Sequence, residues 1–562
     1  MTHPWIAQYP AGIPAEINPD TFASIPTLFD EVAKQYGNNT AFVCMDKELT
    51  FNELNRLSND FAGYLQQLPG LKPGDRVAIM MPNLLQYMIS MIGVLRAGMI
   101  VVNVNPLYTP RELSHQLSDS GAKAIVIIEN FAKTLETVLH ETPVKHIVTT
   151  KVGDMFPLHK RVITDLVVRY VKKMVPQFNL PGHVPFRKAL SIGRSHGHTP
   201  VTLNNNDIAL LQYTGGTTGV SKGAMLTHRN VLANVEQTGT WISQTFIDGQ
   251  EVAMQPLPLY HIFALTSTLC FCKKAAKIVL VPNARDIPAL AELVKKWDFS
   301  VMTGVNTLFN AMLNNKSFRE HKFSRLKIVV GGGAQVQKAV AERWHATTGC
   351  AILEAYGLTE TSPGVCGNLP EAPWDGSVGY PLPSTQVTIR GEEFRDLGMC
   401  SDPEKIPEHT GEICVLGPQV MLGYWEKPEE TANVFVDGWL RTGDVGYMDT
   451  TGRITITDRK KDLIIVNGLN VYPNEIESVI ASMPGVLECG VVGVSNPRIG
   501  ETVKAVIVKK DPALTRDDVV KYCRAQLTGY KVPRTIVFVK ALPKTAVGKI
   551  LRRELKDLRD SE

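Results

Sequence analysis

Short apolar runs alternate along the chain with longer segments in which apolar residues recur every three or four positions. The short runs predict buried strands and the longer segments predict amphipathic helices, an alternation typical of α/β proteins. Strands are predicted at 76–81, 99–103, 124–128, 147–150, 278–282 and 326–330. Helices are predicted between them at 52–67, 111–118, 288–296 and 336–347.

The pattern changes twice toward the C-terminus. From Gly376 the chain reads as short strands and turns, and after Asp458 helix and strand patterns return at 473–483, 486–494, 503–509, 516–527 and 535–538. Residues 459–562 carry 19 basic and 12 acidic side chains, a net charge of +7 against −3 for the rest. We therefore predict two domains, 1–457 and 458–562. The basic block suggests an anionic ligand, with a solvated surface as the alternative.

Composition excludes several classes of protein. Of the 562 residues 44% are hydrophobic and 20% charged, and the net charge is only +4, which gives no support to nucleic-acid binding. The nine cysteines form no C-x-x-C pair, which indicates a reduced, cytoplasmic protein without a disulfide framework or zinc site. We expect no signal peptide, and the apolar region 77–104 is too interrupted for a membrane-spanning helix.

The densest chemical signal is the segment Tyr213–Ala224, Tyr-Thr-Gly-Gly-Thr-Thr-Gly-Val-Ser-Lys-Gly-Ala, which follows a strand-like run. Its glycines let backbone N–H groups turn toward an anion, its hydroxyls add donors, and Lys222 adds a charge, so it predicts a polyphosphate loop. It lacks the Gly-Lys-[Ser/Thr] of a Walker A loop, and the next helix N-cap is Thr227. We therefore expect the loop to join two strands.

The sequence of this loop also allows two alternative functions. Residues 219–223 match the G-x-S-x-G elbow of serine hydrolases, with Ser221 as the nucleophile, but an elbow needs a helix starting at that serine. A nucleotide sensor without catalysis is the second alternative. Labelling of Ser221 by a fluorophosphonate would favour a hydrolase, and absence of pyrophosphate release with any carboxylic acid would favour a sensor.

Six motifs occur in the order found in one known family. Tyr213–Ala224 resembles the AMP-binding signature of the adenylate-forming enzymes, which include acyl-CoA synthetases, luciferases and nonribosomal peptide adenylation domains. Further core motifs of that family are matched by Pro-Leu-Tyr-His at 258–261, Glu-Ala-Tyr-Gly-Leu-Thr-Glu at 354–360, Gly-Trp-Leu-Arg-Thr-Gly-Asp at 438–444, Asp-Arg-Lys-Lys-Asp at 458–462 and Pro-Lys-Thr-Ala-Val-Gly-Lys at 543–549. Residues 437–468 resemble the fatty acyl-CoA synthetase signature, and 41–106 and 527–555 resemble bacterial long-chain-fatty-acid–CoA ligases. Ala355 and the long loop 392–408 depart from the family pattern.

The resemblance implies a fold and a reaction. The fold would be α/β, with a large N-terminal domain of α/β subdomains plus a distorted β-barrel-like subdomain, and a small, mobile α+β C-terminal domain. A fatty acid carboxylate would attack the α-phosphate of ATP to give acyl-adenylate and pyrophosphate, and coenzyme A would then displace AMP. Mg²⁺ would be the metal, and medium-chain or aryl acids remain alternative substrates. A homodimer stays open.

The resemblance also assigns site residues. Thr214, Lys549, His261 and Glu360 would be catalytic, with Thr214 and Glu360 also holding Mg²⁺. The ATP and coenzyme A site would comprise Tyr213, Thr214, Gly215, Gly216, Thr217, Thr218, Gly219, Val220, Ser221, Lys222, Gly223, Ala224, Gly333, Glu354, Tyr356, Gly357, Thr359, Asp444, Arg459 and Gly468.

Within this set the implied roles differ. The loop threonines and Lys222 would hold the β- and γ-phosphates, Tyr356 and Gly357 the adenine, and Asp444 and Arg459 the ribose. Lys549 would stabilise the charge that builds up at the α-phosphate, which requires the C-terminal domain to close over the site and then rotate, bringing Gly468 in for thioester formation.

The acyl end of the site is implied less directly. His261 would line the acyl pocket near the reacting carboxylate, with a purely structural histidine as the alternative. Asn306, Phe309 and residues 331–334 would form other walls of that pocket.

Residues 160–174 predict a helix with one apolar stripe and one basic face. Apolar pairs recur every four residues, and the segment carries five basic residues and one acidic residue. This composition fits a helix lying on anionic lipid, so the enzyme would associate peripherally with the inner face of the membrane. The alternative is a surface helix whose stripe packs on the protein core.

Overall fold

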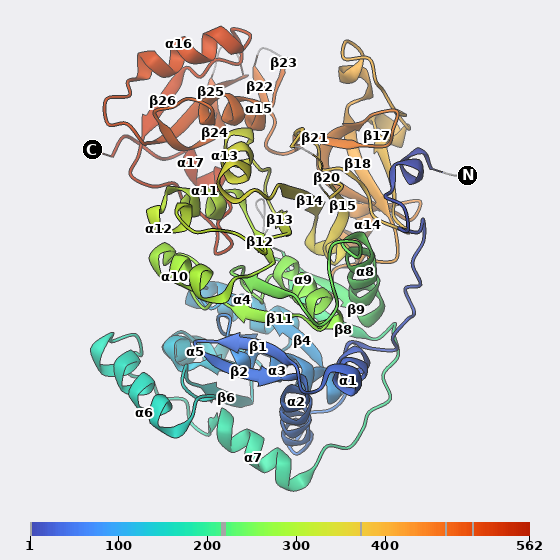
Figure 1. Cartoon of the computed structure of the whole chain (residues 1–562), viewed down its shortest axis with the longest axis vertical. Helices are drawn as coiled ribbons and strands as arrows, with labels where there is room; N and C mark the ends of the chain where they lie inside the picture. Colours follow the sequence, from blue (N-terminus) through green and yellow to red (C-terminus); the bar gives the residue numbers. More distant parts are fainter. Residues whose placement is uncertain are drawn as a thin grey trace.

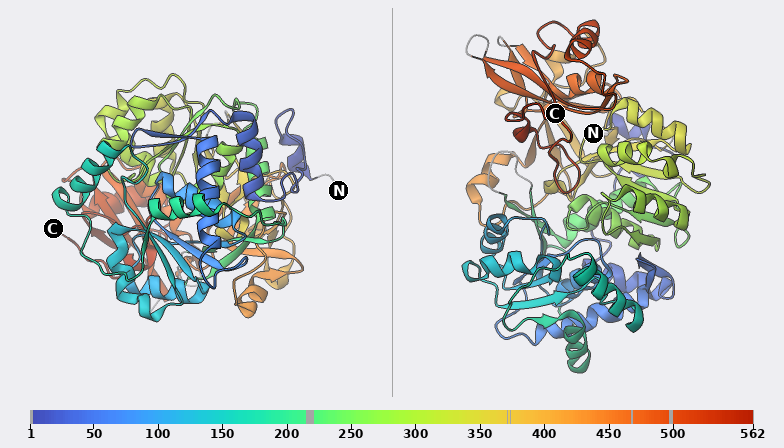
Figure 2. Two further views of the ribbon diagram at one scale, coloured as in Figure 1. Left: turned by 90° about the horizontal axis from the view of Figure 1, so that it is seen from below. Right: turned by 90° about the vertical axis from the view of Figure 1, so that its left-hand side faces the viewer.

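The computed structural model describes residues 3–214, 221–370, 372, 374–466, 469–496 and 500–561. Strands form four sheets, and helices cover the faces of the two largest (Figure 1). The molecule is elongated: the sheet formed by the C-terminal residues lies at one end of the long axis, and helices α6 and α7 lie at the other (Figures 1 and 2).

A seven-stranded sheet has the order β7-β6-β5-β3-β4-β8-β9. Its strands are parallel except for β9, which runs antiparallel to β8. The strands are β3 (Arg76–Met80), β4 (Ile100–Asn103), β5 (Ala124–Ile128), β6 (His146–Thr150), β7 (Val184–Pro185), β8 (Ile208–Tyr213) and β9 (Gly223–Thr227). β5 is buried along its whole length, as expected for an apolar strand in a parallel sheet with both faces covered.

A nine-stranded sheet has the order β16-β15-β14-β13-β12-β10-β11-β1-β2, parallel from β14 to β1. Its strands are β1 (Thr40–Cys44), β2 (Lys47–Thr50), β10 (Val252–Gln255), β11 (Lys277–Leu280), β12 (Val301–Gly304), β13 (Ile328–Gly331), β14 (Ile352–Gly357), β15 (Gly364–Gly367) and β16 (Tyr380–Pro381). The glycines that follow β13 and the motif on β14 therefore meet at one end of neighbouring strands.

Two five-stranded sheets complete the fold. The first, in the predicted barrel-like region, contains β17 (Gln386–Arg390), β18 (Gly411–Leu416), β19 (Phe435–Val436), β20 (Trp439–Met448) and β21 (Ile454–Arg459). The second contains β22 (Ile464–Val466), β23 (Leu469–Val471), β24 (Val486–Asn496), β25 (Gly500–Lys509) and β26 (Thr535–Phe538). The chain passes from one sheet to the other between Arg459 and Ile464, close to the boundary predicted at Asp458.

The helices predicted at 52–67, 111–118, 288–296, 336–347, 473–483 and 516–527 are present as α2, α4, α10, α13, α15 and α16, each end within two residues of the prediction. The helices are α1 (Ile25–Tyr36), α2 (Phe51–Gln66), α3 (Leu85–Arg96), α4 (Pro110–Ser120), α5 (Ala132–Val138), α6 (Leu158–Leu166), α7 (Phe186–His196), α8 (His228–Trp241), α9 (Ile262–Lys273), α10 (Ile287–Trp297), α11 (Asn306–Asn314), α12 (Lys316–Arg319), α13 (Lys338–Thr348), α14 (Pro428–Val434), α15 (Pro473–Ala481), α16 (Arg516–Gln526) and α17 (Arg552–Leu555). At α2 the Thr50 hydroxyl accepts from the Glu53 N–H while the Glu53 carboxylate accepts from the Thr50 N–H, so a capping box fixes its start.

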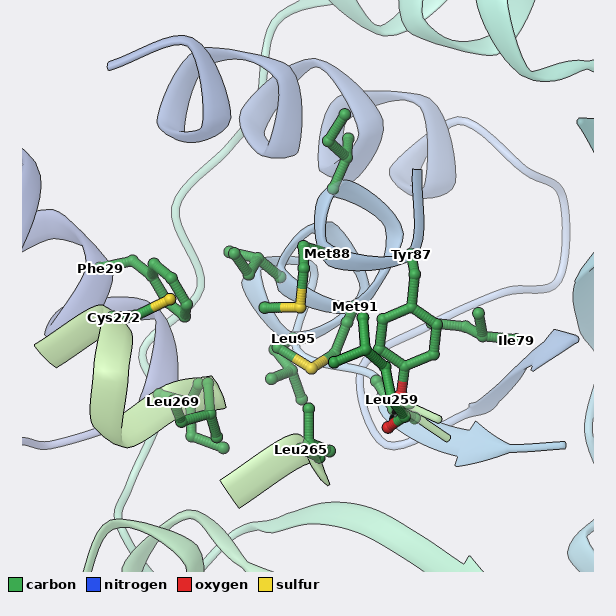
Figure 3. Close-up of a cluster of buried hydrophobic side chains, with 14 of the residues drawn as sticks. Phe29, Ile79, Tyr87, Met88, Met91, Leu95, Leu259, Leu265, Leu269 and Cys272 are labelled. Atoms are coloured by element: carbon green, nitrogen blue, oxygen red, sulfur yellow. Dashed lines mark hydrogen bonds between the residues drawn. The ribbon is translucent and has the colours of Figure 1, made fainter. Parts of the chain in front are cut away.

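Helix α3 lies in the hydrophobic core that joins the two large sheets (Figure 3). All twelve of its residues are buried, and Met88 and Leu95 lie in one cluster with residues of α1 and α9. The Tyr87 hydroxyl lies 2.6 Å from Asn103 Oδ1 and 2.9 Å from Leu259 O, which satisfies its polar atom inside the core. The apolar region 77–104 is therefore a strand, a core helix and a second strand. In the described part of the chain no helix is long and apolar enough to cross a bilayer.

The helix predicted at 160–174 differs from the structure in length and regularity. α6 ends at Leu166, a π-helical turn η4 (Val167–Val171) follows, and Lys173 has a φ of +50°. Neither α6 nor η4 contains a buried residue. The alternative in which the apolar stripe packs on the core is therefore wrong.

Candidate active site

The glycine-rich loop connects two antiparallel strands, as its sequence predicts. Tyr213 at the end of β8 pairs with Gly223 at the start of β9, and the Thr214 N–H donates to Lys222 O at 2.9 Å. Strand β9 begins at Gly223, two residues after Ser221, and α8 begins only at His228, after the N-cap Thr227. This geometry is not a nucleophile elbow, so the serine hydrolase alternative is wrong. The predicted ligands Gly215, Gly216, Thr217, Thr218, Gly219, Val220 and Gly468 lie outside the described residues.

Both ends of the loop are anchored to distant residues. The Tyr213 hydroxyl donates to Asp119 Oδ2 at 2.7 Å, and Asp119 forms an ion pair with Lys427 at 2.9 Å. The Ser221 carbonyl oxygen lies 3.0 Å from His115 Nε2. The loop residues on either side of the undescribed segment thus have fixed positions.

A segment two hundred residues later, 421–430, packs along β9. Ala224 forms a β-bridge with Tyr424, and the Trp425 N–H donates to Gly223 O at 2.8 Å. The Met225 N–H donates to Gly423 O at 2.9 Å. These bonds place the 421–430 segment beside the C-terminal end of the glycine-rich loop 213–224, which we call the phosphate loop.

Glu360 lies in the short helix η5 (Thr359–Thr361), next to the same segment. Its Oε1 accepts from the Tyr424 hydroxyl at 2.7 Å, and the Lys222 ammonium lies 5.2 Å from the centre of the Tyr424 ring. Among the described residues no hydrogen bond engages Oε2. Glu360 is thus a half-buried carboxylate beside the glycine-rich loop, and its Oε2 is available to a ligand. Such a group suits Mg²⁺, which binds through few carboxylates plus phosphate oxygens and water.

Asp444 lies at the centre of a second polar cluster. It pairs with Arg459 across β20 and β21, with Arg459 Nε 2.9 Å from Asp444 Oδ1, and it accepts from the Tyr356 hydroxyl on Oδ2 at 2.8 Å. Asp444 is only 3% exposed, so this carboxylate is held rigidly. Gly357 follows Tyr356, and a Cβ there would lie 1.9 Å from Pro363 O, so only glycine allows this close approach.

Glu354 is a buried acid on β14. Its Oε1 accepts from the Val336 N–H at 2.9 Å, whereas Oε2 has no hydrogen-bond partner among the described residues. Burial raises the Glu354 pKa to about 8, so the side chain is mainly protonated at neutral pH. Gly333, with a φ of +76°, lies in the turn that leads from β13 to Val336.

The C-terminal domain places Lys549 against the N-terminal residues. Burial and the nearby Arg459 lower the Lys549 pKa to about 8, while Asp444 opposes this shift. Burial and the Lys549 ammonium likewise lower the His261 pKa to about 4, so His261 is neutral at pH 7. His261 is also the N-cap of α9, where Nδ1 accepts from the Phe263 N–H at 3.3 Å. Lys549, His261 and the Asp444–Arg459 pair thus influence one another's charge, although they come from three separate parts of the sequence.

Two cavities border this region. One of about 270 Å³ is lined by Glu360 and Tyr424 together with residues of α14 and β20. The other, about 250 Å³, is lined by Thr442, Gly443 and the three cations Arg459, Lys460 and Lys461. Thr442 and Gly443 line both, so the two cavities are neighbours, and the cationic one suits an anionic ligand.

The model of the AMP-binding enzymes matches residues 29–425, and the model of their C-terminal domain matches residues 475–549. The chain belongs to the AMP-binding enzyme family. This AMP-binding enzyme is 52% identical over 559 residues to the long-chain-fatty-acid–CoA ligase of Salmonella typhimurium, covering 99% of this chain and 98% of the relative. It is 37% identical over 560 residues to the ligase of the same name from Bacillus subtilis, with 98% and 97% covered.

The fold of the AMP-binding enzyme matches solved structures over nearly its whole length. An anthranilate–CoA ligase in complex with anthranoyl-AMP superposes with a TM-score of 0.84 at 23% identity, covering 96% of this chain and 98% of that one. The predicted fold class, a large N-terminal α/β part and a small C-terminal domain, is thereby confirmed.

Sequence reasoning missed several residues beside the phosphate loop of the AMP-binding enzyme. Asp119, Tyr424 and Glu430 contact loop residues, and Lys427 pairs with Asp119. These four residues lie about a hundred residues before the loop or two hundred after it. No local spacing links them to the loop, so only the fold reveals them. Phe309, a predicted wall of the acyl pocket, is fully buried against Trp344 and packs as core.

Proposed function

We propose that this AMP-binding enzyme is an ATP-dependent long-chain-fatty-acid–CoA ligase that works through an acyl-adenylate and releases AMP and pyrophosphate. Full-length relatives of that name, one of them 52% identical, support the substrate class. The observation that carries the reaction type is the meeting of Lys549 with His261 and with the Asp444–Arg459 ion pair. A cation delivered to this point can stabilise the charge that builds up when a carboxylate attacks the α-phosphate.

We assign the site residues as the sequence motifs suggest. Lys222 and the loop hydroxyls would hold the β- and γ-phosphates, Asp444 and Arg459 the ribose, and Tyr356 with Gly357 the adenine side of the nucleotide. Thr214 and Glu360 would hold Mg²⁺, which supplies neutralising charge to the phosphate oxygens when it is bound. Neutral His261 adds no charge beside the fatty acid carboxylate.

A chain-length panel tests the substrate class. CoA-dependent AMP release is measured with acids from acetate to stearate and with 4-coumarate as an aryl acid. We expect the highest kcat/KM with C12–C18 fatty acids. A maximum at medium chain length or with 4-coumarate would favour the alternative ligases, and a maximum with acetate would overturn the proposal.

We also propose that α6 and η4 dock on an anionic lipid surface. The apolar stripe is solvent-exposed, with Ile163 at 61%, Tyr170 at 68% and Val171 at 74%. Two of the five basic side chains already have partners within the protein. Arg169 forms an ion pair with Glu129, and the Lys160 ammonium donates a hydrogen bond to Met45 O. Arg161, Lys172 and Lys173 remain to meet lipid phosphates, each contributing about 1 kcal/mol near such a surface.

Co-sedimentation with vesicles of anionic and of zwitterionic lipid tests this docking. A variant with Arg161, Lys172 and Lys173 changed to Gln should bind anionic vesicles more weakly, and Ile163→Ser with Tyr170→Ser should weaken binding to both. The matched control changes Lys316, Lys322 and Lys338 on another face to Gln. Equal loss in the control, or no binding by the parent, would contradict the proposal. A homodimer is a separate proposal, which light scattering contradicts if it gives the mass of one chain.

A further inference from the structure

The side chain expected to grip the triphosphate already has an anionic partner in this structure. Lys222 forms an ion pair with Glu430, in the first turn of α14. Both side chains are partly exposed, at 31% for Lys222 and 47% for Glu430, so the pair is accessible to a ligand. The Glu430 carboxylate thus occupies the position beside the Lys222 ammonium at which a phosphate oxygen would bind.

Glu430 is held at this place by the backbone of the 421–430 segment. Three backbone hydrogen bonds join that segment to β9, at Gly223 and on both sides of Met225, and Gly223 is the residue after Lys222. The Thr431 hydroxyl accepts from the Tyr424 N–H at 2.9 Å and donates to Lys427 O at 2.9 Å, which ties the start of α14 back onto the segment. These bonds fix the backbone of Glu430 within reach of the Lys222 ammonium.

The same segment reaches the proposed metal carboxylate. Tyr424 donates to Glu360 and offers its ring to the Lys222 ammonium. Lys222, Tyr424, Glu360 and Glu430 thus form one connected cluster, and a change of partner at Lys222 occurs next to the group that would hold Mg²⁺.

We propose that Glu430 is a placeholder for the triphosphate: its carboxylate competes with the β- and γ-phosphates for Lys222 and so sets how tightly MgATP binds and how readily pyrophosphate leaves. This inference rests on the proposed function, and it adds a residue that tunes affinity to those that perform the chemistry. Glu430 is a positioning residue, because it acts through Lys222.

The size of the effect follows from the exposure of the pair. Exposed ion pairs contribute about 0.2–1 kcal/mol, which corresponds to roughly 1.4- to fivefold in a binding constant. Removing the competitor should tighten MgATP and pyrophosphate by a similar factor, because both ligands would use the same ammonium. The exchange is therefore easily reversed, as release of a product requires.

The test measures binding directly. Isothermal titration gives the Kd of MgATP and of magnesium pyrophosphate for the parent, Glu430→Gln and the control Glu429→Gln, an exposed residue one position earlier with the same charge change. We expect both Kd values to fall roughly 1.4- to fivefold in Glu430→Gln and to stay unchanged in the control. In a Lys222→Gln background, Glu430→Gln should produce no further change, since the two residues act on each other.

The outcomes separate this inference from the proposed function. Weaker MgATP binding in Glu430→Gln would mean that Glu430 orients Lys222 and would overturn the inference, as would unchanged binding. Equal tightening in Glu429→Gln would assign the effect to diffuse charge and also overturn it. A parent that binds no MgATP overturns the proposed function as well, whereas a parent that binds MgATP and activates fatty acids leaves that function standing whatever Glu430 does.

Discussion

A half-buried lysine beside an arginine is unfavourable until an anion joins them, and Lys549 is in this position next to Arg459. The lowered pKa of Lys549 reflects this unfavourable free energy of its charged form. A nucleotide phosphate would remove the cost by pairing with both cations. The same residue is therefore poorly placed for stability and well placed for adenylation.

Replacing Lys549 with Ala should slow acyl-adenylate formation by about 10²–10³-fold, the usual cost of losing one preorganised charge in a transition state. Thiolysis of supplied acyl-adenylate should be largely spared, because in that step no carboxylate approaches a phosphate. Each half-reaction is measured separately by rapid quench. The exposed Lys540→Ala serves as the control, and equal loss of both half-reactions would contradict a role specific to adenylation.

Glu354 gives a prediction at the same scale. The unfolded acid ionises above about pH 4.5, whereas the folded acid keeps its proton until about pH 8. Stability therefore falls as pH rises between these two values, by about 1.4 kcal/mol per pH unit, and is constant above the folded pKa. Glu354→Gln keeps the shape and does not titrate, so its melting temperature relative to the parent should rise from pH 5.5 to pH 8. A difference that is constant with pH would show that Glu354 is ionised in the fold.

Site residues could be predicted from the sequence where they belong to a contiguous motif. Asp444, Glu360 and Lys549 stand at fixed positions within such motifs, and the structure places each beside other predicted residues or beside the loop. Glu430 and Asp119 carry no such signal, because they lie on α14 and α4, and only the fold brings these helices to Lys222 and Tyr213. The unpaired oxygen of Glu354 is likewise visible only once burial is known.

At the scale of elements, helices α2 and α7 pack against each other through glycines. A Cβ at Gly193 would lie 1.6 Å from Asp60 O, and one at Gly63 would lie 2.6 Å from Gly197 O. The two backbones can approach this closely only without side chains at the contact. The sequence shows the glycines but not that they face each other.

Gly193→Ala should destabilise the protein by about 3 kcal/mol or more, since the added methyl group meets backbone rather than a flexible side chain. Urea denaturation followed by circular dichroism measures the loss. The exposed Ser191→Ala in the same helix should change stability by less than about 0.5 kcal/mol. Equal stability of the two variants would mean that α2 and α7 can separate without cost.

Element boundaries were predicted best where apolar runs are short and buried. The strands at 124–128 and 535–538 match β5 and β26 in full, because their residues are fixed by a sheet. The helix predicted at 160–174 was too long and too regular, because periodicity does not reveal a π turn or the left-handed Lys173. Its uncovered stripe could not be predicted either, since periodicity gives a face and not what covers it.

At the scale of the whole molecule, two bonds join α11 to the C-terminal part of the chain. The Thr307 hydroxyl donates to Gly548 O at 2.9 Å, next to Lys549, and Asn310 Nδ2 donates to Leu487 O at 3.0 Å. Arg552 in turn binds Asp458, Asp462 and Glu477, so the loop that carries Lys549 is tied to the predicted hinge. The C-terminal part is thus closed against α11 in the described arrangement, as the proposed first half-reaction would require.

Closure without nucleotide should depend on pH. An open domain would return Lys549 to its ordinary pKa of 10.5, against about 8 when closed, so closing releases a proton between these values. The closed form is therefore favoured as pH rises from about 8 toward 10.5, and its preference is independent of pH below 8. Small-angle scattering should show compaction from pH 8 to pH 9.5 in the parent and none in Lys549→Met. Compaction on lowering the pH would contradict the assignment.

Helix α6 and the C-terminal domain occupy opposite ends of the long axis (Figures 1 and 2). An enzyme resting on a bilayer through α6 would hold its moving domain out in the water, with the full width of the larger domain between it and the headgroups. Rotation between the two half-reactions would then displace no lipid, and crowding at the surface would not slow it. The protein could stay bound at the membrane surface, where fatty acids partition, and still complete its catalytic cycle at the rate it has in free solution.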